Sequence, residues 1–421
     1  MSTRLQEILS GFQRPFWVAN FTEIFERLSY YAVFAALVPY LNTTLGFPTT
    51  VAATLGGIFG GAVWVMAAFG GALADRIGFR RALSTAYFIL ACAYFLVGSI
   101  GAPWLAPVRS VVPLWLLVGI ILLLPALGVA LVKPSVVGTT ARASSEKTRS
   151  IGYSIYYTMV NIGSFFGPLL AGWVHTHLPT EDGFLLAALS VLLMLVVVLV
   201  FFKEPRSATA VKAPTLGEVA KNFVTVIGNW RFSLFLLIFS GYWFVYWQQW
   251  LILSKYVTNF VDKSANPDYF LSVDPAIVIT CTVLMSLLTR KLSAFRAIVL
   301  GSLITSLSWL VLVVHASMLF VVLALVVLAI GEIIQSPRYY EYISRLAPEG
   351  QQGTYLGFAF LPIGIGSFVA GPIGGALYHH FGEVLNQPAT IWFIVTGVGL
   401  LTTALLWIYD KTIKPAEQVA T

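Results

Sequence analysis

Twelve long apolar segments are the feature that most constrains how this chain of 421 residues can fold. An α-helix rises about 1.5 Å per residue, so about 20 apolar residues cross the roughly 30 Å hydrocarbon core of a bilayer. Strands of a membrane β-barrel are only about 10 residues long and apolar at alternate positions, which these segments are not. The sequence therefore predicts an all-α membrane protein with twelve transmembrane helices. The segments cover approximately residues 16–42, 51–74, 82–101, 113–138, 150–174, 183–202, 232–256, 268–289, 295–315, 318–344, 353–378 and 388–409.

The composition supports a membrane protein. Hydrophobic residues make up 58% of the chain and charged residues only 10%, whereas soluble domains carry about 25% charged residues. This balance excludes a soluble enzyme and a nucleic-acid-binding protein, and it makes the lipid bilayer the expected partner. The sequence contains no phosphate-binding loop, nucleophile motif or cysteine-based metal motif, so we expect no enzymatic activity and no cofactor.

The distribution of Lys and Arg predicts the orientation in the membrane. With a cytoplasmic amino terminus, 20 of the 25 Lys and Arg residues fall in cytoplasmic segments, and only Arg109, Lys255 and Lys263 fall on the other side. Cytoplasmic loops are the ones that carry such an excess. We therefore expect a multi-pass protein of the cell membrane, a monomer, with both termini in the cytoplasm.

One long polar interruption divides the apolar segments into six and six. The expected domains are an N-terminal six-helix bundle over residues 1–203, a cytoplasmic linker over 204–230, and a C-terminal six-helix bundle with a tail over 231–421. Apolar residues recur at helical spacing within the linker, which predicts a short helix on the membrane surface.

The loop between the second and third segments carries a recognisable motif. It reads Gly-Gly-Ala-Leu-Ala-Asp-Arg-Ile-Gly-Phe-Arg-Arg over residues 70–81. This motif resembles the signature loop of the major facilitator superfamily, and the arrangement of six plus six helices extends the resemblance over the whole chain. We expect a conformational latch formed by Asp75, Arg76, Gly78 and Arg80, in which Asp75 accepts hydrogen bonds from exposed amides at a neighbouring helix N-terminus.

Four charged residues are expected within the membrane in the first half. Glu23, Glu26 and Arg27 share one stripe of the first helix, and Lys133 precedes Pro134 in the fourth. A charge at mid-membrane costs about 2.5 to 3.5 kcal/mol on insertion scales, so each is a functional candidate. The two acids balance the two bases only while both are ionised. One interpretation is a switch, in which protonation of a glutamate lets an anionic group bind; the other is a permanent structural cluster.

The second half has a surplus of negative charge at the same depth. Asp274 and Glu332 have no Lys or Arg beside them in the expected helices, so they should either hold protons or bind a cation. Pairing of Asp274 with Lys255 is the alternative, and it would make Asp274 structural. Opposite surpluses in the two halves suit a zwitterionic solute.

Four segments resemble a narrower family, the proton-dependent oligopeptide transporters. The residues over 23–31 match its ExxER-F-x-Y-Y signature, and further matches are Lys133-Pro134, Asn161-Ile162-Gly163-Ser164, and Gly331-Glu332 with Ser336-Pro337. The resemblance implies proton coupling through the first-helix cluster and Lys133, a carboxylate contact by Lys133, and recognition of the amino end of a peptide by Glu332 and polar residues of the fifth and eighth helices. The candidate substrate-binding residues are Tyr30, Tyr31, Phe34, Lys133, Asn161, Trp247, Gln248, Asp274 and Glu332.

The departures from that family bear on the substrate. Phe34 replaces a second arginine, Gln248-Gln249 replaces a Glu-Gln pair, and Asp274 replaces an asparagine before Pro275. The two additional helices that bacterial members often carry between the halves are missing. The aromatic residues around Trp247 are either packing and interfacial residues or a wall against the substrate.

Together these features predict a proton-coupled symporter of a small, zwitterionic, peptide-like solute that works by alternating access. The alternatives are a proton-driven exporter of amphipathic or drug-like compounds and a ligand-binding membrane receptor that does not transport. Five histidines lie at the outer ends of the expected helices and are expected to be interfacial residues rather than a metal site. They are His175, His177, His315, His379 and His380.

Overall fold

The computed structural model describes residues 10–145, 148–205, 216–347 and 352–413. Their regular structure is helical, apart from one isolated bridge between Phe12 and Ser144. By internal contacts the chain groups into two compact units. The first unit comprises residues 1–34 and 66–219, and the second comprises residues 35–65 and 220–421. The expected domains divide the chain at the linker, according to the order of the helices in the sequence. This division stays a prediction.

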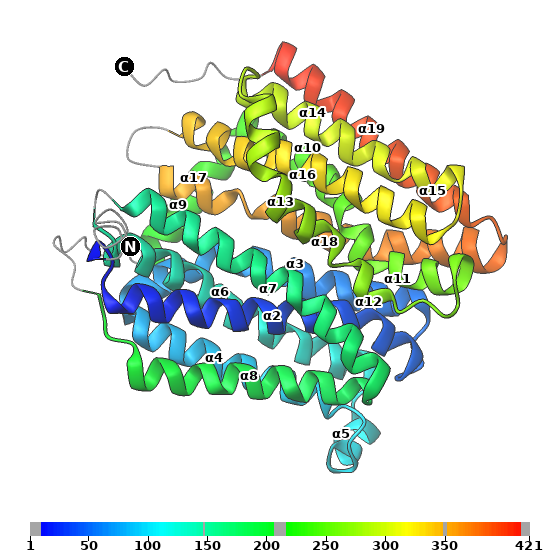
Figure 1. The fold of residues 1–421 in the computed structure, drawn as a ribbon, viewed down its shortest axis with the longest axis horizontal. Helices are drawn as coiled ribbons and strands as arrows, with labels where there is room; N and C mark the ends of the chain where they lie inside the picture. Colours follow the sequence, from blue (N-terminus) through cyan, green and yellow to red (C-terminus); the bar gives the residue numbers. More distant parts are fainter. Residues whose placement is uncertain (1–9, 146–147, 206–215, 348–351, 414–421) are drawn as a thin grey trace, which may run out of the picture. The chain divides into compact units, whose positions relative to one another are not determined.

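The first unit contains most of the helices before the linker (Figure 1). In chain order they are α2 (Arg14–Thr43), α3 (Thr49–Ile77), α4 (Phe79–Gly98), α5 (Ala106–Val111), α6 (Leu114–Ala143), α7 (Arg149–His177) and α8 (Thr180–Phe201). The first 21 residues of α2 and the last 12 of α3 belong to this unit, and the rest of both helices belongs to the second. α4 packs between α6 and α8.

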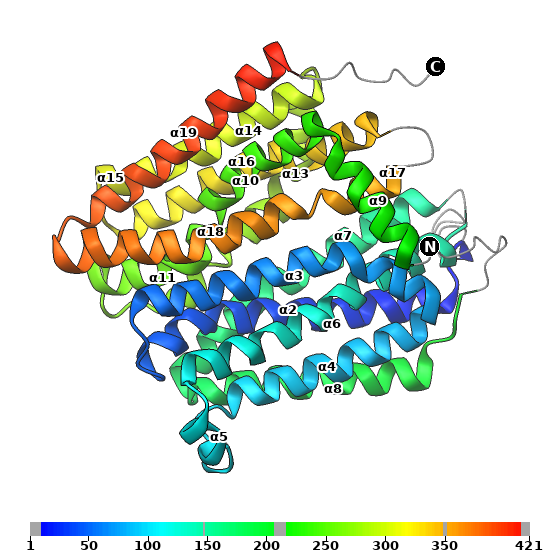
Figure 2. The same cartoon turned by 180° about the vertical axis from the view of Figure 1, so that it is seen from behind.

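The second unit contains the helices of the other half (Figure 2). They are α10 (Trp230–Leu251), α11 (Leu253–Tyr256), α12 (Pro267–Phe270), α13 (Val273–Thr289), α14 (Ala294–Ser308), α15 (Leu310–Val314), α16 (Met318–Leu346), α17 (Gln352–Phe358), α18 (Leu361–Leu377) and α19 (Pro388–Thr412). α16 packs against α13 and α14, while α10 packs against α18 and α19. The linker contains the expected short helix, α9 (Leu216–Gly228).

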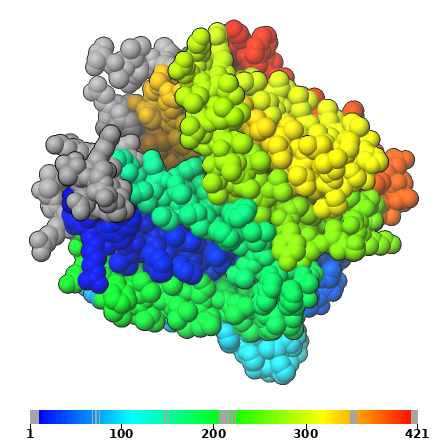
Figure 3. All heavy atoms as spheres, viewed as in Figure 1, coloured from blue at the N-terminus to red at the C-terminus, as the bar shows by residue number. Residues whose placement is uncertain are grey.

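Nine helical segments of the described chain are long and apolar enough to cross a membrane. Apolar side chains of α8 such as Leu189 and Leu193 are more than two-fifths exposed, which contact with lipid explains. The helix α8 lies along one edge of the first unit (Figure 3). Three further helices, α2, α7 and α10, are 30, 29 and 22 residues long. These three carry polar candidate site residues, which lowers their mean hydropathy.

Candidate functional site

Arg27 is the centre of a buried ionic cluster on α2. Its guanidinium donates to both carboxylate oxygens of Glu26, from Nε to Oε2 and from Nη2 to Oε1, the latter at 2.7 Å. Nε also lies 3.5 Å from Oε1 of Glu23. The three side chains are at most 1% exposed. These residues therefore pair, as their shared stripe on the helix allows. Arg27 holds the two glutamates unequally, because it donates two hydrogen bonds to Glu26 and makes a longer ionic contact with Glu23.

Lys133 of α6 completes the cluster. It interacts electrostatically with Glu23, Glu26 and Arg27, and its side chain is partly exposed. Pro134 follows it within α6, and a proline inside a helix leaves one carbonyl without its amide donor and loosens the local turn. The arrangement brings two acids and two bases together in the first unit, as the sequence predicted.

Glycines of α7 set the close approach of that helix to the cluster. A Cβ on Gly163 would lie 2.5 Å from Cβ of Arg27, and one on Gly167 would lie 2.7 Å from the carbonyl oxygen of Leu28. Only glycine fits so near another backbone. Asn161 lies two residues before Gly163 on α7, and its amide donates to the Tyr157 carbonyl at 2.8 Å. These glycines explain why an Asn-Ile-Gly-Ser segment lies opposite the α2 signature.

Aromatic rings continue the α2 stripe beyond the charges. Arg27 lies 5.0 Å from the ring centroid of Tyr30, which is within cation–π range. The Tyr30 ring contacts those of Tyr31 and Phe34 at centroid distances of 5.2 and 5.9 Å. Tyr30 and Phe34 are buried, and Tyr31 is partly exposed. Phe34 therefore adds apolar surface next to the cluster where the resembling family has a second cation.

A pair of acids forms the corresponding cluster in the second unit. Asp274 of α13 is 2% exposed, and its Oδ2 accepts from the Tyr246 hydroxyl at 3.0 Å and from the Gln249 amide at 3.2 Å. Glu332 of α16 lies within hydrogen-bonding reach of Asp274 and Tyr246. Among the described residues of this unit, neither acid forms an ion pair with Lys or Arg. We call Asp274 and Glu332 the carboxyl pair.

The face of α10 that meets the carboxyl pair differs from the expected one. Tyr246 and Gln249 contact Asp274, whereas the indole N–H of Trp247 donates to the Ile363 carbonyl of α18 at 2.9 Å. Gln248 donates to the Phe244 carbonyl of its own helix at 3.0 Å. Sequence reasoning did not select Tyr246 or Gln249, because α10 is aromatic around its whole circumference and offers no periodic signal to orient it.

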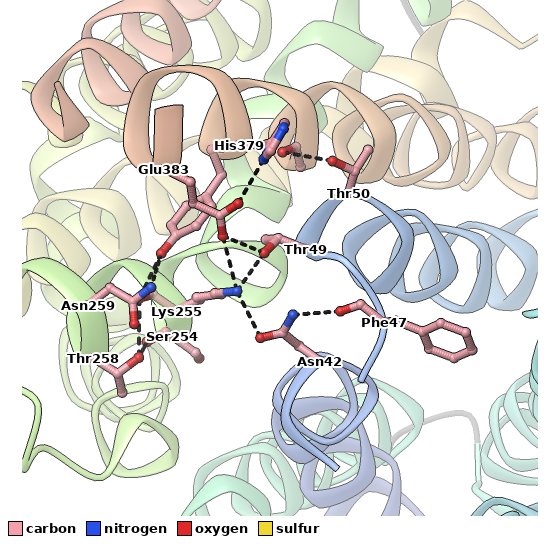
Figure 4. A network of polar contacts seen from close by, with 12 residues as sticks. Asn42, Phe47, Thr49, Thr50, Ser254, Lys255, Thr258, Asn259, His379 and Glu383 are labelled. Carbon is pink, nitrogen blue, oxygen red and sulfur yellow. Dashed lines mark hydrogen bonds and ion pairs between the residues drawn. The ribbon is translucent and has the colours of Figure 1, made fainter. Parts of the chain in front are cut away.

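Lys255 does not pair with Asp274, which answers a question that the sequence left open. Its ammonium donates to Asn42 Oδ1 at 2.8 Å and to Thr49 Oγ1 at 2.5 Å, and it lies 3.2 Å from Oε1 of Glu383 (Figure 4). The other carboxylate oxygen of Glu383 contacts His379 Nδ1 at 2.8 Å. We call these five residues the Lys255 network. They come from the end of α2, the start of α3, α11, and the π-helical turn Tyr378–Val384.

Small residues join α3 to α18 next to the Lys255 network. The Ser367 hydroxyl donates to the Gly57 carbonyl at 3.1 Å. A Cβ on Gly57 would lie 3.0 Å from Cα of Gly371, and one on Gly375 would lie 2.8 Å from Cα of Thr50. Such contact between backbones is typical of small residues at helix interfaces in membranes. The N-terminal part of α3 is thus held against α18 by packing. Its first residue, Thr49, contacts Lys255 and Glu383.

Loss of the Lys255 ammonium is expected to destabilise this region. Hydrogen bonds to a charged group contribute about 1.5 to 3 kcal/mol, while a partly exposed ion pair adds up to about 1 kcal/mol. We expect Lys255→Met to lower the free energy of unfolding by about 2 to 3 kcal/mol, measured as a lower thermal midpoint in detergent. Arg345→Met is the control, because its ion pair with Glu341 lies within one helix turn and its side chain is 51% exposed. Equal shifts in both variants would contradict the assignment.

Within the first unit, a glutamate from outside the signature loop caps the N-terminus of α4. The sequence did not suggest this residue. Glu204 accepts from the backbone amides of Phe79 at 2.8 Å and Arg80 at 3.0 Å. Gly78 precedes them with φ of +86°, a conformation that favours glycine. The guanidinium of Arg80 donates to the Leu199 carbonyl at 2.7 Å, and Arg76 is exposed. The side chain of Asp75 lies outside the described residues, so its latch role stays a prediction.

Comparison with known families identifies this architecture. The family model described as Major Facilitator Superfamily matches residues 20–273 and 269–421. The chain belongs to the Major Facilitator Superfamily. It is therefore a multi-pass membrane transporter, and the resemblance stated from the signature loop is confirmed.

Curated relatives in this superfamily carry the name Multidrug resistance protein MdtH. The protein of Yersinia enterocolitica serotype O:8 is 25% identical over 350 residues, which is 82% of this chain and 81% of that protein. The protein of Yersinia pestis (strain Pestoides F) is 24% identical over 348 residues, with the same coverage.

Solved structures of POT family transporters share the fold. One in complex with a thioalcohol-conjugated peptide has a TM-score of 0.81 at 17% identity and covers 97% of this chain and 100% of its own. Another, in complex with 5-aminolevulinic acid, has a TM-score of 0.77 at 18% identity and covers 96% of this chain and 97% of its own. These likenesses establish the fold.

Proposed function

We propose that this superfamily member is a proton-coupled symporter of a small zwitterionic, peptide-like solute, with α2, α7 and α10 completing twelve transmembrane helices in two six-helix bundles. The observation that carries the proposal is the buried cluster in which Arg27 holds Glu26 by two hydrogen bonds and Glu23 by one longer contact. A cluster of this kind changes its net charge by one unit when it binds or releases a single proton. Alternating access then carries the proton and the solute together.

Glu23 is the proposed proton acceptor of the cluster. It is fully buried, and neither of its carboxylate oxygens has a hydrogen-bond donor among the described residues. A buried carboxylate without donors costs far more free energy than one held by two N–H groups. The proton therefore goes to Glu23, while Glu26 keeps Arg27 in place.

Protonation of Glu23 prepares the cluster for an anionic group. With Glu23 neutral, the four ionisable residues carry one negative and two positive charges, so the cluster has a net charge of +1. Lys133, whose side chain is partly exposed, is the proposed contact for the carboxylate of the solute. Because opposite charges attract strongly where water is scarce, proton binding and carboxylate binding assist each other.

The carboxyl pair is the proposed contact for the amino group of the solute. Asp274 and Glu332 supply negative charge in the second unit, as Arg27 and Lys133 supply positive charge in the first. The ammonium group of a zwitterion is a suitable partner for such a pair of acids. Solved POT relatives of the same fold were crystallised with a conjugated peptide and with 5-aminolevulinic acid, both in keeping with an amine-bearing ligand.

Transport in liposomes tests the proposal directly. The full-length protein is reconstituted, and the uptake of radiolabelled alanyl-alanine is followed with an acidic outer solution and with equal pH on both sides. One pH unit stores about 1.4 kcal/mol per proton, which supports about tenfold accumulation when one proton accompanies each solute. Accumulation that ignores the pH gradient would contradict coupling. An acetylated dipeptide, which lacks the ammonium group, is the control for amine recognition.

A second candidate function is proton-driven export of amphipathic compounds. It is favoured by the curated relatives named Multidrug resistance protein MdtH, and by Phe34, which places a buried aromatic ring beside Tyr30. The same liposomes separate the two candidates. Export predicts that a proton gradient drives ethidium across the membrane in the direction opposite to the protons. It also predicts that alanyl-alanine does not accumulate under any gradient.

A further inference from the structure

Two buried tyrosines of α4 lie next to the Arg27 cluster. The strongest electrostatic interaction of Tyr87 is with Glu23, whereas that of Tyr94 is with Glu26. Both tyrosine side chains are fully buried, and neither hydroxyl has a hydrogen-bond partner among the described residues. Such hydroxyls are rare in proteins, because they lose their hydrogen bonds to water and gain none in return. Neither tyrosine has a part in the proposed transport cycle.

The spacing along α2 and α4 explains why the two tyrosines meet different parts of the cluster. Tyr87 and Tyr94 are seven residues apart, which is two turns of α4, so they lie on the same face of that helix. Glu23 and Tyr30 are also seven residues apart on α2, and Tyr94 interacts with Tyr30. α4 packs on α6, the helix that carries Lys133. Tyr87 therefore stands at the Glu23 end of the cluster, and Tyr94 stands at the Tyr30 end.

The hydroxyl of Tyr87 has two possible acceptors. The first is the Thr22 hydroxyl, which interacts with it and donates its own hydrogen to the Ala19 carbonyl at 3.0 Å. The oxygen of Thr22 is thus left to accept. The second is the carboxylate of Glu23, whose two buried oxygens have no donor among the described residues. An ionised carboxylate is a much stronger acceptor than a hydroxyl, so the preferred acceptor depends on the proton of Glu23.

The other groups that act on Glu23 are charged. Glu26 and Arg27 act from α2, and Lys133 acts from α6, while α7 approaches this stretch of α2 with glycines. Tyrosines ordinarily titrate near pH 10. Near neutral pH Tyr87 therefore keeps its hydrogen and can donate it without changing the net charge of the cluster.

We propose that Tyr87 is a positioning residue that sets the pH at which Glu23 exchanges its proton. While Glu23 is protonated, the Tyr87 hydroxyl donates to Thr22. When Glu23 releases its proton to water, the hydroxyl turns and donates to the carboxylate, so the ionised state is stabilised. Tyr87 keeps its own hydrogen throughout. The role of this hydrogen bond in transport, which is to favour release of the proton after the solute has crossed, rests on the proposed function.

Infrared titration of the full-length protein in nanodiscs tests the proposal. The C=O stretch of the protonated Glu23 carboxyl group is followed against pH and is assigned by its absence in Glu23→Gln. In Tyr87→Phe the ionised form loses a donor, so we expect the midpoint of the titration to rise by about one to two pH units. Tyr94→Phe is the matched control, because it removes the same buried atom from the same face of α4. Its midpoint should move by less than about half a unit.

Three results would overturn the proposal. They are an unchanged midpoint in Tyr87→Phe, equal shifts in Tyr87→Phe and Tyr94→Phe, and a titrating signal that survives in Glu23→Gln. Both phenylalanine variants keep the aromatic ring, so the packing of α4 is preserved.

The pH profile of alanyl-alanine uptake into liposomes gives a second measurement. In Tyr87→Phe, Glu23 holds its proton at a higher pH, so half-maximal uptake should move to a higher outer pH by the same one to two units. A merely structural role of Tyr87 would lower uptake at every pH and leave the midpoint in place. That result would contradict the proposal.

The two proposals can fail separately. If alanyl-alanine is not accumulated but Tyr87→Phe still moves the infrared midpoint, the symporter assignment fails and the role of Tyr87 stands. If alanyl-alanine is accumulated with the gradient but the midpoint does not depend on Tyr87, the role of Tyr87 fails and the symporter assignment stands.

Discussion

Glu23→Gln is expected to reduce gradient-driven accumulation of alanyl-alanine from about tenfold per pH unit to none. Glutamine has nearly the shape of glutamic acid but cannot release a proton, so the cluster stays in the state that accepts an anion. Exchange of labelled for unlabelled solute at equal pH needs no net proton movement and should continue. The measurement is uptake and counterflow in the same preparation of liposomes.

Glu26→Gln provides an informative comparison with the first variant. It removes a carboxylate that accepts two hydrogen bonds from Arg27, so the position of the guanidinium should change as well as the charge. We expect Glu26→Gln to reduce both accumulation and exchange, whereas Glu23→Gln reduces accumulation alone. If both variants still accumulate the solute tenfold, the proton does not bind in the Arg27 cluster.

Glu181→Gln is the matched control in the first unit. Glu181 lies in the first turn of α8, where the loss of a negative charge at a helix N-terminus costs about 0.3 to 1 kcal/mol. We expect unchanged accumulation in this variant. Failure of the control would show that any loss of an acid in this unit affects the folded protein.

The local parts of the fold were predictable from the sequence. Residues of α2 at positions i, i+3 and i+4 must lie close together on one helix, so the association of Glu23, Glu26 and Arg27 followed from spacing alone. The helical class, the α9 segment and the superfamily followed from segment length, apolar periodicity and the signature loop. Each of these depends on residues that are neighbours along the chain.

Contacts between distant segments were not predictable in the same way. Glu383 was missed as the partner of Lys255, since the Lys255 network is assembled from three separate parts of the chain. The depth of Lys255 along its helix made Asp274 an equally reasonable partner. The face of α10 was undetermined because every face is aromatic, so Gln248 was selected and Gln249 was not. Glu204 lies beyond the sixth helix, and no local pattern connects it to α4.

Arg27→Met is expected to cause the largest loss of stability among these variants. The change leaves the Glu26 carboxylate buried without its two guanidinium donors, and removes the contact between Arg27 and Glu23. Removing one partner of a buried ion pair costs about 3 to 5 kcal/mol, because the other charge stays out of water without compensation. The measurement is the thermal midpoint in detergent, together with the fraction of monodisperse protein. Arg296→Met is the control, because an exposed arginine should shift stability by less than about 0.5 kcal/mol.

A second substitution should reverse much of that loss. In the double variant Arg27→Met with Glu26→Gln, position 26 no longer carries a charge that needs the guanidinium. Replacing both partners of a buried ion pair often changes the stability little. We therefore expect the double variant to be more stable than Arg27→Met alone, although it should not couple transport to protons. A double variant that is less stable than either single variant would mean that Arg27 acts mainly through its packing against Tyr30 and Gly163. Recovery of stability without recovery of coupling would separate the structural role of the ion pair from its role in binding a proton.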